Sequence, residues 1–214
     1  MTRIRGVIHV CQTGNWKRSF DILLRNLLAS GLYDASESID VCIVSQSLPS
    51  KLSGFPKMNC FRVGLPGVYE RLSLLHLRQR AIEDKEEVFY WYLHTKGLRW
   101  FGTEREQNVL DWIDLMLYWN VTRWRTAVTR LSEGNDAYGC NQTQEPANHY
   151  SGNFWWARSS HLRRLPATIG EGYNDPEFWI LSPKDARAFC VYNSGLEGMG
   201  HYLRPYPKEL YIQE

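Results

Sequence analysis

The chain has 214 residues and a net charge of +2, with 22% charged and 43% hydrophobic residues, which is an ordinary globular balance. The charge gives no support for a nucleic-acid partner, and no apolar run approaches the roughly 18 residues of a transmembrane helix. The five cysteines contain no CxxC pair, which favours buried free thiols in a reducing compartment such as the cytoplasm. We therefore predict a single domain, residues 1–214, without a transmembrane segment.

The first half of the chain alternates strand and helix patterns. Asn15 is a plausible N-cap for the first helix and Gly31 a plausible stop, and a polar loop is expected over 47–58. The hydrophobic periodicity predicts strands over 5–11, 39–45, 59–64 and 88–93, and helices over 16–31 and 70–87. This alternation predicts an α/β fold with a mostly parallel sheet flanked by helices.

The second half of the chain has a different pattern. Thr103 and Glu106 form a capping box, which predicts one long helix reaching to about 131. We expect short strands at 136–140, 151–157 and 186–192, short helices from 159 and at 176–181, and an extended tail over 198–214.

The most informative segment is the buried strand pattern 88–93 and the residues that follow it. The apolar run is followed by His94, Thr95 and Lys96. Gly97 comes next and allows a sharp turn, because glycine tolerates φ > 0. Ligands of open α/β sheets bind outside the carboxyl ends of strands. An imidazole, a hydroxyl and an ammonium at such an end predict a site for a phosphorylated ligand.

Several motifs follow in an order that resembles a known enzyme class. After the Leu-His-Thr-Lys-Gly motif come Gly-Asn-Phe-Trp-Trp at 152–156, Asp-Pro-Glu at 175–177 and a late histidine, His201. As a set they resemble the GT-A class of nucleotide-sugar glycosyltransferases, and within it the small UDP-sugar glycosyltransferase domains encoded by chlorella viruses. The resemblance implies a Rossmann-like GT-A fold with a mixed, mostly parallel sheet, a nucleotide-binding part over about 1–100 and an acceptor or metal part over about 101–214. It also implies a UDP-sugar donor, a glycan or glycoprotein acceptor and, for a viral protein, the host cytoplasm.

The resemblance also implies roles for individual residues. GT-A enzymes usually hold Mn²⁺ through Asp-x-Asp, which this sequence lacks, so His94 and His201 are the expected metal ligands. Glu177, and next Asp175, is the expected catalytic carboxylate, acting on the acceptor hydroxyl or shielding the oxocarbenium ion. The expected contacts to the donor nucleotide and its sugar come from Thr13, Gly14, Asn15, Arg78, Thr95, Lys96, Gly152, Asn153, Trp155 and Lys208.

Two other classes of function compete with this prediction. One is another Rossmann-like nucleotide enzyme, although the first strand is followed only by Thr-Gly-Asn and not by Gly-x-Gly-x-x-Gly. The other is a non-catalytic carbohydrate-binding module, which the 14% aromatic content would suit. Such a module would not need histidine and lysine at a strand end. Further domains of a longer polypeptide would be compatible with all three.

Overall fold

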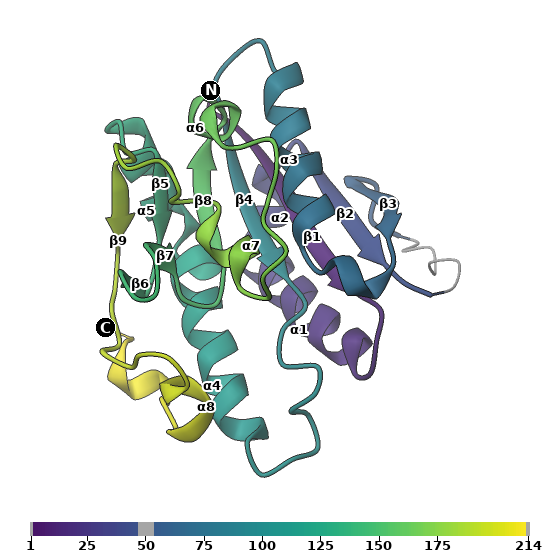
Figure 1. Ribbon diagram of the computed structural model, residues 1–214, viewed down its shortest axis with the longest axis vertical. Helices are drawn as coiled ribbons and strands as arrows, with labels where there is room; N and C mark the ends of the chain where they lie inside the picture. Colours follow the sequence, from purple (N-terminus) through teal and green to yellow (C-terminus); the bar gives the residue numbers. More distant parts are fainter. Residues whose placement is uncertain (1, 47–53, 213–214) are drawn as a thin grey trace.

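The computed structural model describes residues 2–46 and 54–212, and its centre is a seven-stranded sheet with strand order β3-β2-β1-β4-β8-β5-β9 (Figure 1). Part of the predicted loop over 47–58 lies outside the described residues. The strands of this sheet are β1 (Arg3–Cys11), β2 (Ser38–Val44), β3 (Met58–Gly64), β4 (Val88–His94), β5 (Ala137–Gly139), β8 (Trp155–Arg158) and β9 (Ala188–Cys190). A separate hairpin joins β6 (Gln142–Thr143) to β7 (His149–Tyr150).

The pairing confirms the predicted α/β fold with a mixed, mostly parallel sheet. Strands β1 to β4 are mutually parallel, and β5 is parallel to β9. Strand β8 alone runs antiparallel to both of its neighbours, β4 and β5. The carboxyl ends of all the parallel strands therefore meet at one edge of the sheet, with the start of β8 between them.

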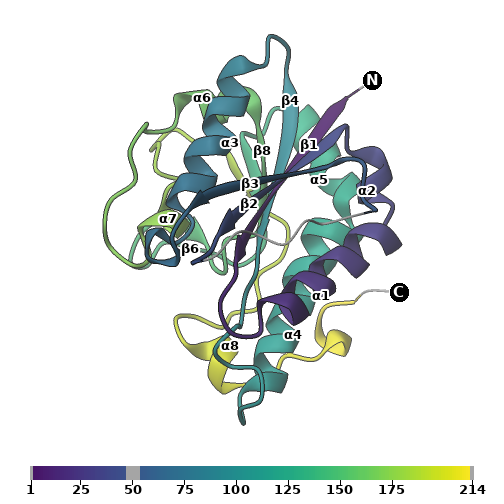
Figure 2. The same ribbon diagram turned by 90° about the vertical axis from the view of Figure 1, so that its right-hand side faces the viewer.

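Helices cover both faces of the sheet (Figure 2). One face packs against α1 (Trp16–Ala29), α4 (Glu106–Leu117) and α5 (Trp124–Ser132), and the other against α3 (Arg71–Glu83) and α6 (Ser159–Arg164). Alternate strand residues feed the two cores, so Trp91 and Trp156 lie in the first and Tyr92 and Trp155 in the second. Shorter helices complete the fold: α2 (Leu32–Ala35), α7 (Asp175–Phe178), α8 (Gly200–Leu203) and the 3-10 turns Pro66–Val68 and Lys208–Leu210.

The predicted long helix over 103–131 is wrong as a single element. Helix α4 passes into a π-helical turn, Tyr118–Thr122, before α5 begins. The Asn120 side chain bonds to the Met116 carbonyl, while the Asn120 carbonyl accepts a hydrogen bond from the Trp156 indole at 2.8 Å. The expected capping box is also not formed, because the Glu106 carboxylate reaches back to the Gly102 N–H.

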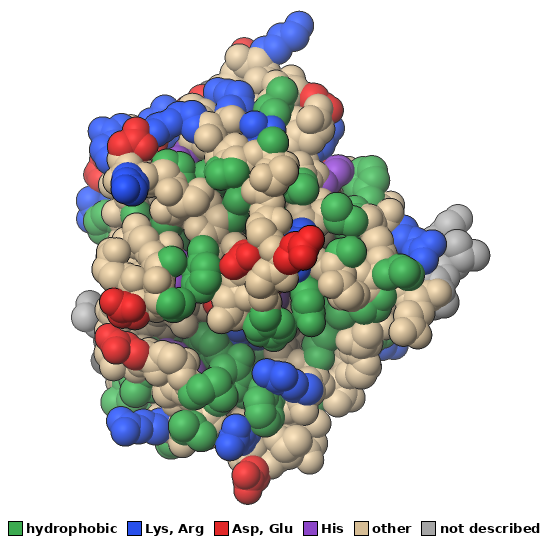
Figure 3. All heavy atoms as spheres, in the orientation of Figure 1, with side chains coloured by type: hydrophobic (Ala, Val, Ile, Leu, Met, Phe, Trp, Pro, Cys, Tyr) green, Lys and Arg blue, Asp and Glu red, His purple; other side chains and the backbone are tan. Residues whose placement is uncertain are grey.

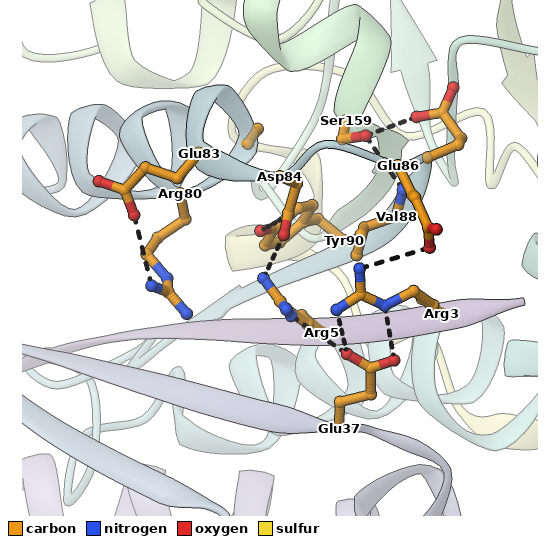
Figure 4. Close-up of polar contacts among 12 residues, drawn as sticks. Arg3, Arg5, Glu37, Arg80, Glu83, Asp84, Glu86, Val88, Tyr90 and Ser159 are labelled. Carbon is orange, nitrogen blue, oxygen red and sulfur yellow. Dashed lines mark hydrogen bonds and ion pairs between the residues drawn. The ribbon is translucent and has the colours of Figure 1, made fainter.

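Two further boundaries differ from the prediction. Helix α3 ends at Glu83, because Asp84 adopts an extended backbone and its carboxylate binds Arg5 and the Tyr90 hydroxyl at the amino end of the sheet (Figure 4). From the helical spacing we expected Leu72, Leu77 and Ile82 to face inward. Leu77 is buried as expected, together with Leu74 and Ala81, whereas Leu72 and Ile82 are 36% and 44% exposed. The tail is not fully extended, since it contains α8 and a 3-10 turn.

None of the helices in the described part of the chain is long and apolar enough to cross a membrane. All five cysteines carry free thiols, as expected. Cys42 and Cys140 are buried, Cys11 and Cys190 are half-buried, and Cys60 is exposed. The prediction that the cysteines are buried therefore holds only in part.

Candidate functional site

Two adjoining cavities open at the carboxyl ends of the central strands. Their volumes are about 650 Å³ and about 340 Å³. Figure 3 shows the face that carries α7, with acidic side chains among hydrophobic ones near its middle and basic side chains below them. The residues that line both cavities are Tyr69, Glu70, His94, Lys96, Arg99, Tyr173 and Tyr202. The strand end singled out in the sequence therefore lies between the two cavities.

The tip of β4 is braced by neighbouring elements. The Ser19 hydroxyl of α1 accepts a hydrogen bond from the Lys96 N–H at 2.9 Å and donates one to the Lys96 carbonyl at 3.0 Å. Thr95 Oγ1 accepts a hydrogen bond from the Cys11 N–H at the end of β1. Gly97 has a φ of 79°, and a Cβ there would lie 2.6 Å from Val109. Thr95 and Gly97 line the smaller cavity. The hydrogen bonds from Ser19 and Cys11 fix the backbone from which the Lys96 side chain extends.

Lys96 carries a buried ammonium beside the cavities. The residue is 9% exposed, and its Nζ lies 3.9 Å from the centroid of the Trp112 ring. None of the ion pairs among residues 2–46 and 54–212 includes it. A cation–π contact stabilises the ammonium by roughly 0.5–2 kcal/mol, which is less than the several kcal/mol that burying an unpaired charge costs. The site is therefore complementary to an anion.

His94 is neutral at pH 7 and fixed in orientation. Burial lowers the pKa of its imidazole to about 4, and the Lys96 ammonium acts in the same direction. Its Nε2 lies 2.9 Å from the Gly152 carbonyl and its Nδ1 3.2 Å from the Thr95 carbonyl, so the shorter contact places the proton on Nε2. Nδ1 lies 4.0 Å from Oε1 of Glu70.

His201 lies behind the cavity wall. Its ring stacks on Trp112 at a centroid distance of 5.0 Å, and burial, followed by the Lys96 ammonium, lowers its pKa to about 4. Asn141 Oδ1 accepts the Ser194 N–H, so the Asn141 amide donates to Nε2 of His201. The proton of the neutral ring therefore lies on Nδ1, which is buried and has no hydrogen-bond partner among the described residues.

The two histidines do not fit a shared metal as they are arranged. A metal would need a free lone pair from each ring, and the lone pair of His201 is engaged by Asn141 and Ser194. Over the described ranges, no three His, Cys, Asp or Glu side chains are grouped so as to hold a metal ion by themselves. Metal assistance by Mn²⁺ therefore stays a prediction.

Of the two predicted carboxylates, only Glu177 lies in a cavity wall. It comes from α7, lines the larger cavity and lies near enough to His94 to raise the pKa of that imidazole against the effect of burial. Asp175 lines neither cavity, because its carboxylate accepts the Gly172 N–H at 2.8 Å. Asp175 thereby shapes the loop that carries Tyr173 into both cavities.

The expected nucleotide-binding loop after β1 is only partly at the site. Thr13 lines the smaller cavity, while Gly14 and Asn15 line neither. Gly14 has a φ of 52° and turns the chain into α1. Asn15 occupies the N-cap position, but its side chain is exposed and makes no capping hydrogen bond.

The Gly-Asn-Phe-Trp-Trp motif lies behind the cavities instead of lining them. Gly152 offers its carbonyl to His94, and a Cβ there would lie 2.4 Å from Met116 Sδ. Asn153 and Trp155 are fully buried, and the Trp155 indole donates to Asn153 Oδ1 at 2.7 Å. Trp155, which was expected to contact the donor sugar, is fully buried, as is Trp156, and neither residue lines the two cavities.

Two other predicted cationic contacts lie elsewhere. The Arg78 guanidinium binds the Leu165 and Arg163 carbonyls and so ties α3 to α6. Lys208 Nζ lies 3.3 Å from Asp114 on an exposed surface. Neither residue lines the two cavities.

Glu70, Arg99 and the three tyrosines that line both cavities, Tyr69, Tyr173 and Tyr202, were not predicted from the sequence. Glu70 follows a 3-10 turn and immediately precedes α3, in the loop that leaves the carboxyl end of β3. The rule that ligands bind at this edge of the sheet would have drawn attention to that loop. The hydrogen bonds that hold the Glu70 carboxylate come from Tyr92 and Asn153, which are far away in the sequence, so no local pattern predicts them.

No protein-family model matches the chain, and no curated protein gives a significant match to its sequence. A function for the chain must therefore be argued from the chemistry of this site.

Proposed function

We propose that this protein is a GT-A-type glycosyltransferase that moves a sugar from a UDP-sugar to a hydroxyl group of a glycan or glycoprotein acceptor. The observation that carries the proposal is the buried, unpaired Lys96 ammonium between two cavities. A diphosphate is the anion that would compensate this charge and also join a nucleoside in one cavity to a sugar in the other.

The size and position of the cavities support a two-part ligand. Both volumes fall in the usual range for small-molecule sites, roughly 300–1,000 Å³. We assign the smaller cavity, beside Thr13, to the nucleoside and the larger one, beside Glu177, to the sugar and the acceptor. The antiparallel strand within a mostly parallel sheet is compatible with the mixed sheet expected for a GT-A fold.

The residues present can supply the chemistry of sugar transfer. Negative charge develops on the β-phosphate as UDP departs, and preorganised cations that offset such charge usually give the largest catalytic contribution. Lys96 and Arg99 are the cations of the shared walls. Glu177 is the carboxylate that we place near the sugar, where it would either take the acceptor proton or stabilise the oxocarbenium ion.

A thermal-shift screen separates this proposal from its alternatives. A ligand that binds the native state raises the melting temperature by mass action. We expect the melting temperature to rise with UDP and not with NAD or S-adenosylmethionine. A rise with NAD or S-adenosylmethionine would indicate another Rossmann-like enzyme. GDP tests whether the site prefers uracil to guanine. A protein that responds to oligosaccharides but to no nucleotide would be a carbohydrate-binding module. Repeating the UDP arm with Mn²⁺ and with EDTA tests the predicted metal.

A further inference from the structure

Glu70 is held at the junction of the two cavities with its two carboxylate oxygens in different surroundings. Oε2 accepts a hydrogen bond from the Tyr92 hydroxyl and another from the Asn153 amide, both at 2.7 Å. Oε1 accepts no hydrogen bond from any described residue and lies 4.0 Å from Nδ1 of His94. One oxygen is therefore anchored, and the other is left for a ligand.

The two donors that hold Glu70 are themselves fixed. The Trp155 indole donates to Asn153 Oδ1, so the amide NH₂ group of Asn153 must face Glu70. The Tyr92 ring stacks on Trp155 at a centroid distance of 5.0 Å. Burial, followed by the charge of Glu70, raises the pKa of Tyr92 well above its usual range, so its hydroxyl stays a donor. The buried Gly-Asn-Phe-Trp-Trp motif at 152–156 thus fixes the orientation of the Glu70 carboxylate.

The backbone is strained at two residues next to the Glu70 carboxylate. Tyr69, which directly precedes Glu70, has a φ of 49°, and Asn153, which donates to Glu70, has a φ of 59°. A positive φ is uncommon for asparagine and rarer for a bulky residue, and it costs of order 1–3 kcal/mol. Strain of this kind persists where surrounding contacts enforce it, often at ligand sites.

We propose that Glu70 is the general base of the transfer reaction, an assignment that rests on the function proposed above. Oε1 takes the proton from the acceptor hydroxyl as the acceptor oxygen forms its bond to the anomeric carbon. The bond between that carbon and the β-phosphate oxygen breaks, and its electron pair leaves with UDP. The transfer is a single displacement and inverts the anomeric configuration.

Glu177 is the competing candidate for this role. Its side chain makes no hydrogen bond to any described residue that would fix the carboxylate, whereas Glu70 is fixed by two donors. A base must lie within hydrogen-bond reach of the proton that it removes, so a fixed orientation favours Glu70. Glu177 is then left to stabilise positive charge on the sugar.

The test compares UDP release by wild type, Glu70→Gln and Glu177→Gln. The probes are UDP-glucose, UDP-galactose and UDP-N-acetylglucosamine, each with water alone and with sodium azide as the acceptor. Attack by water requires a base, whereas azide is already an anion and has no proton to lose. We expect Glu70→Gln to lower UDP release in water at least ~10²-fold and to leave azide-dependent release within about threefold of wild type. Glu177→Gln should lower both.

The outcomes separate the two proposals. Unchanged release by Glu70→Gln in water, or an equal loss with water and azide, would overturn the role of Glu70 as base. A wild-type protein that neither binds UDP nor releases it from any of the three donors would instead overturn the proposed function.

A second pair of variants tests the positioning of Glu70. Tyr92→Phe removes one of its two donors and should lower UDP release in water about tenfold while sparing release with azide. Tyr90→Phe is the matched control, because Tyr90 lies two residues earlier on β4 and its hydroxyl also binds a carboxylate, that of Asp84 (Figure 4). That contact lies at the opposite end of the sheet, so release by Tyr90→Phe should equal wild type. Equal effects of the two variants would count against the positioning role.

Discussion

At the scale of single residues, Lys96 is the side chain on which the proposed nucleotide binding depends most directly. Lys96→Met keeps the length of the side chain and removes the charge, so it should weaken UDP binding at least tenfold, the low end of a lost charge-assisted contact. Lys208→Met is the matched control, because Lys208 is paired with Asp114 away from the cavities. Isothermal titration calorimetry measures both. If Lys208→Met proved the weaker binder, the phosphate contact would belong to the tail.

Glu177 is expected to affect catalysis and not binding. Glu177→Gln preserves the shape of the side chain, so the Kd for UDP should stay within a few-fold of wild type. Sugar transfer should fall at least ~10²-fold, because the charge that stabilises the oxocarbenium ion is lost. Asp175→Asn serves as the comparison, since Asp175 holds the Gly172 N–H and lines no cavity. Steady-state rates for both variants decide the matter. Wild-type turnover by Glu177→Gln together with loss in Asp175→Asn would transfer the role to Asp175.

Sequence reasoning identified part of this site and could not identify the rest. His94, Lys96 and Glu177 were found because each follows or begins a recognisable element, and an element end can be read from a hydrophobic pattern. Glu70 could not be found in this way, because its partners Tyr92 and Asn153 lie 22 and 83 residues away. Which buried polar groups share a hydrogen bond depends on tertiary contacts that no local pattern encodes.

At the scale of elements, strands β1 to β4 were predictable and the long helix was not. Strand β8 begins at Trp155 and not at 151, and the β6–β7 hairpin was not predicted. Alternating or continuous apolar runs define β1, β2 and β4 within two residues of the predicted bounds. The apolar pattern over 103–131 suits one straight helix equally well. In the π-helical turn inside it, the Asn120 carbonyl accepts a hydrogen bond from the indole of Trp156, 36 residues further along the chain. A single tertiary hydrogen bond of this kind leaves no trace in the periodicity.

The start of α1 carries a prediction about an element boundary. Asn15 makes no capping hydrogen bond, so Asn15→Ala should change the free energy of unfolding by less than about 0.5 kcal/mol. Ser159→Ala, at the start of α6, should cost about 1–2 kcal/mol, because that hydroxyl binds Glu87 and the Val88 N–H. Urea unfolding compares the two. A lower UDP affinity of Asn15→Ala without a loss of stability would place Asn15 in nucleotide binding, and an unchanged affinity would exclude it.

At the scale of the whole molecule, three buried imidazoles make stability depend on pH. Burial lowers the pKa of His9, His94 and His201 to about 4, from 6.5 in the unfolded chain. Between these values the unfolded state binds more protons than the native state, so stability is fully present above pH 6.5 and is lost as the pH falls through about 4. Each group contributes up to about 1.4 kcal/mol per pH unit in that window. Urea unfolding at several pH values tests this, and a constant free energy of unfolding from pH 7 to 4 would contradict it.

The unpaired charge of Lys96 lowers the stability of the free protein and at the same time suits the site to bind an anion. An ammonium that rests on Trp112 without a carboxylate partner leaves part of its desolvation cost uncompensated in the free protein. Selection for stability alone would replace this lysine with an apolar residue, whereas selection for binding an anion would keep it. Variants chosen only for a higher melting temperature are therefore expected to lose this charge first, and with it the anion binding that we propose for the site.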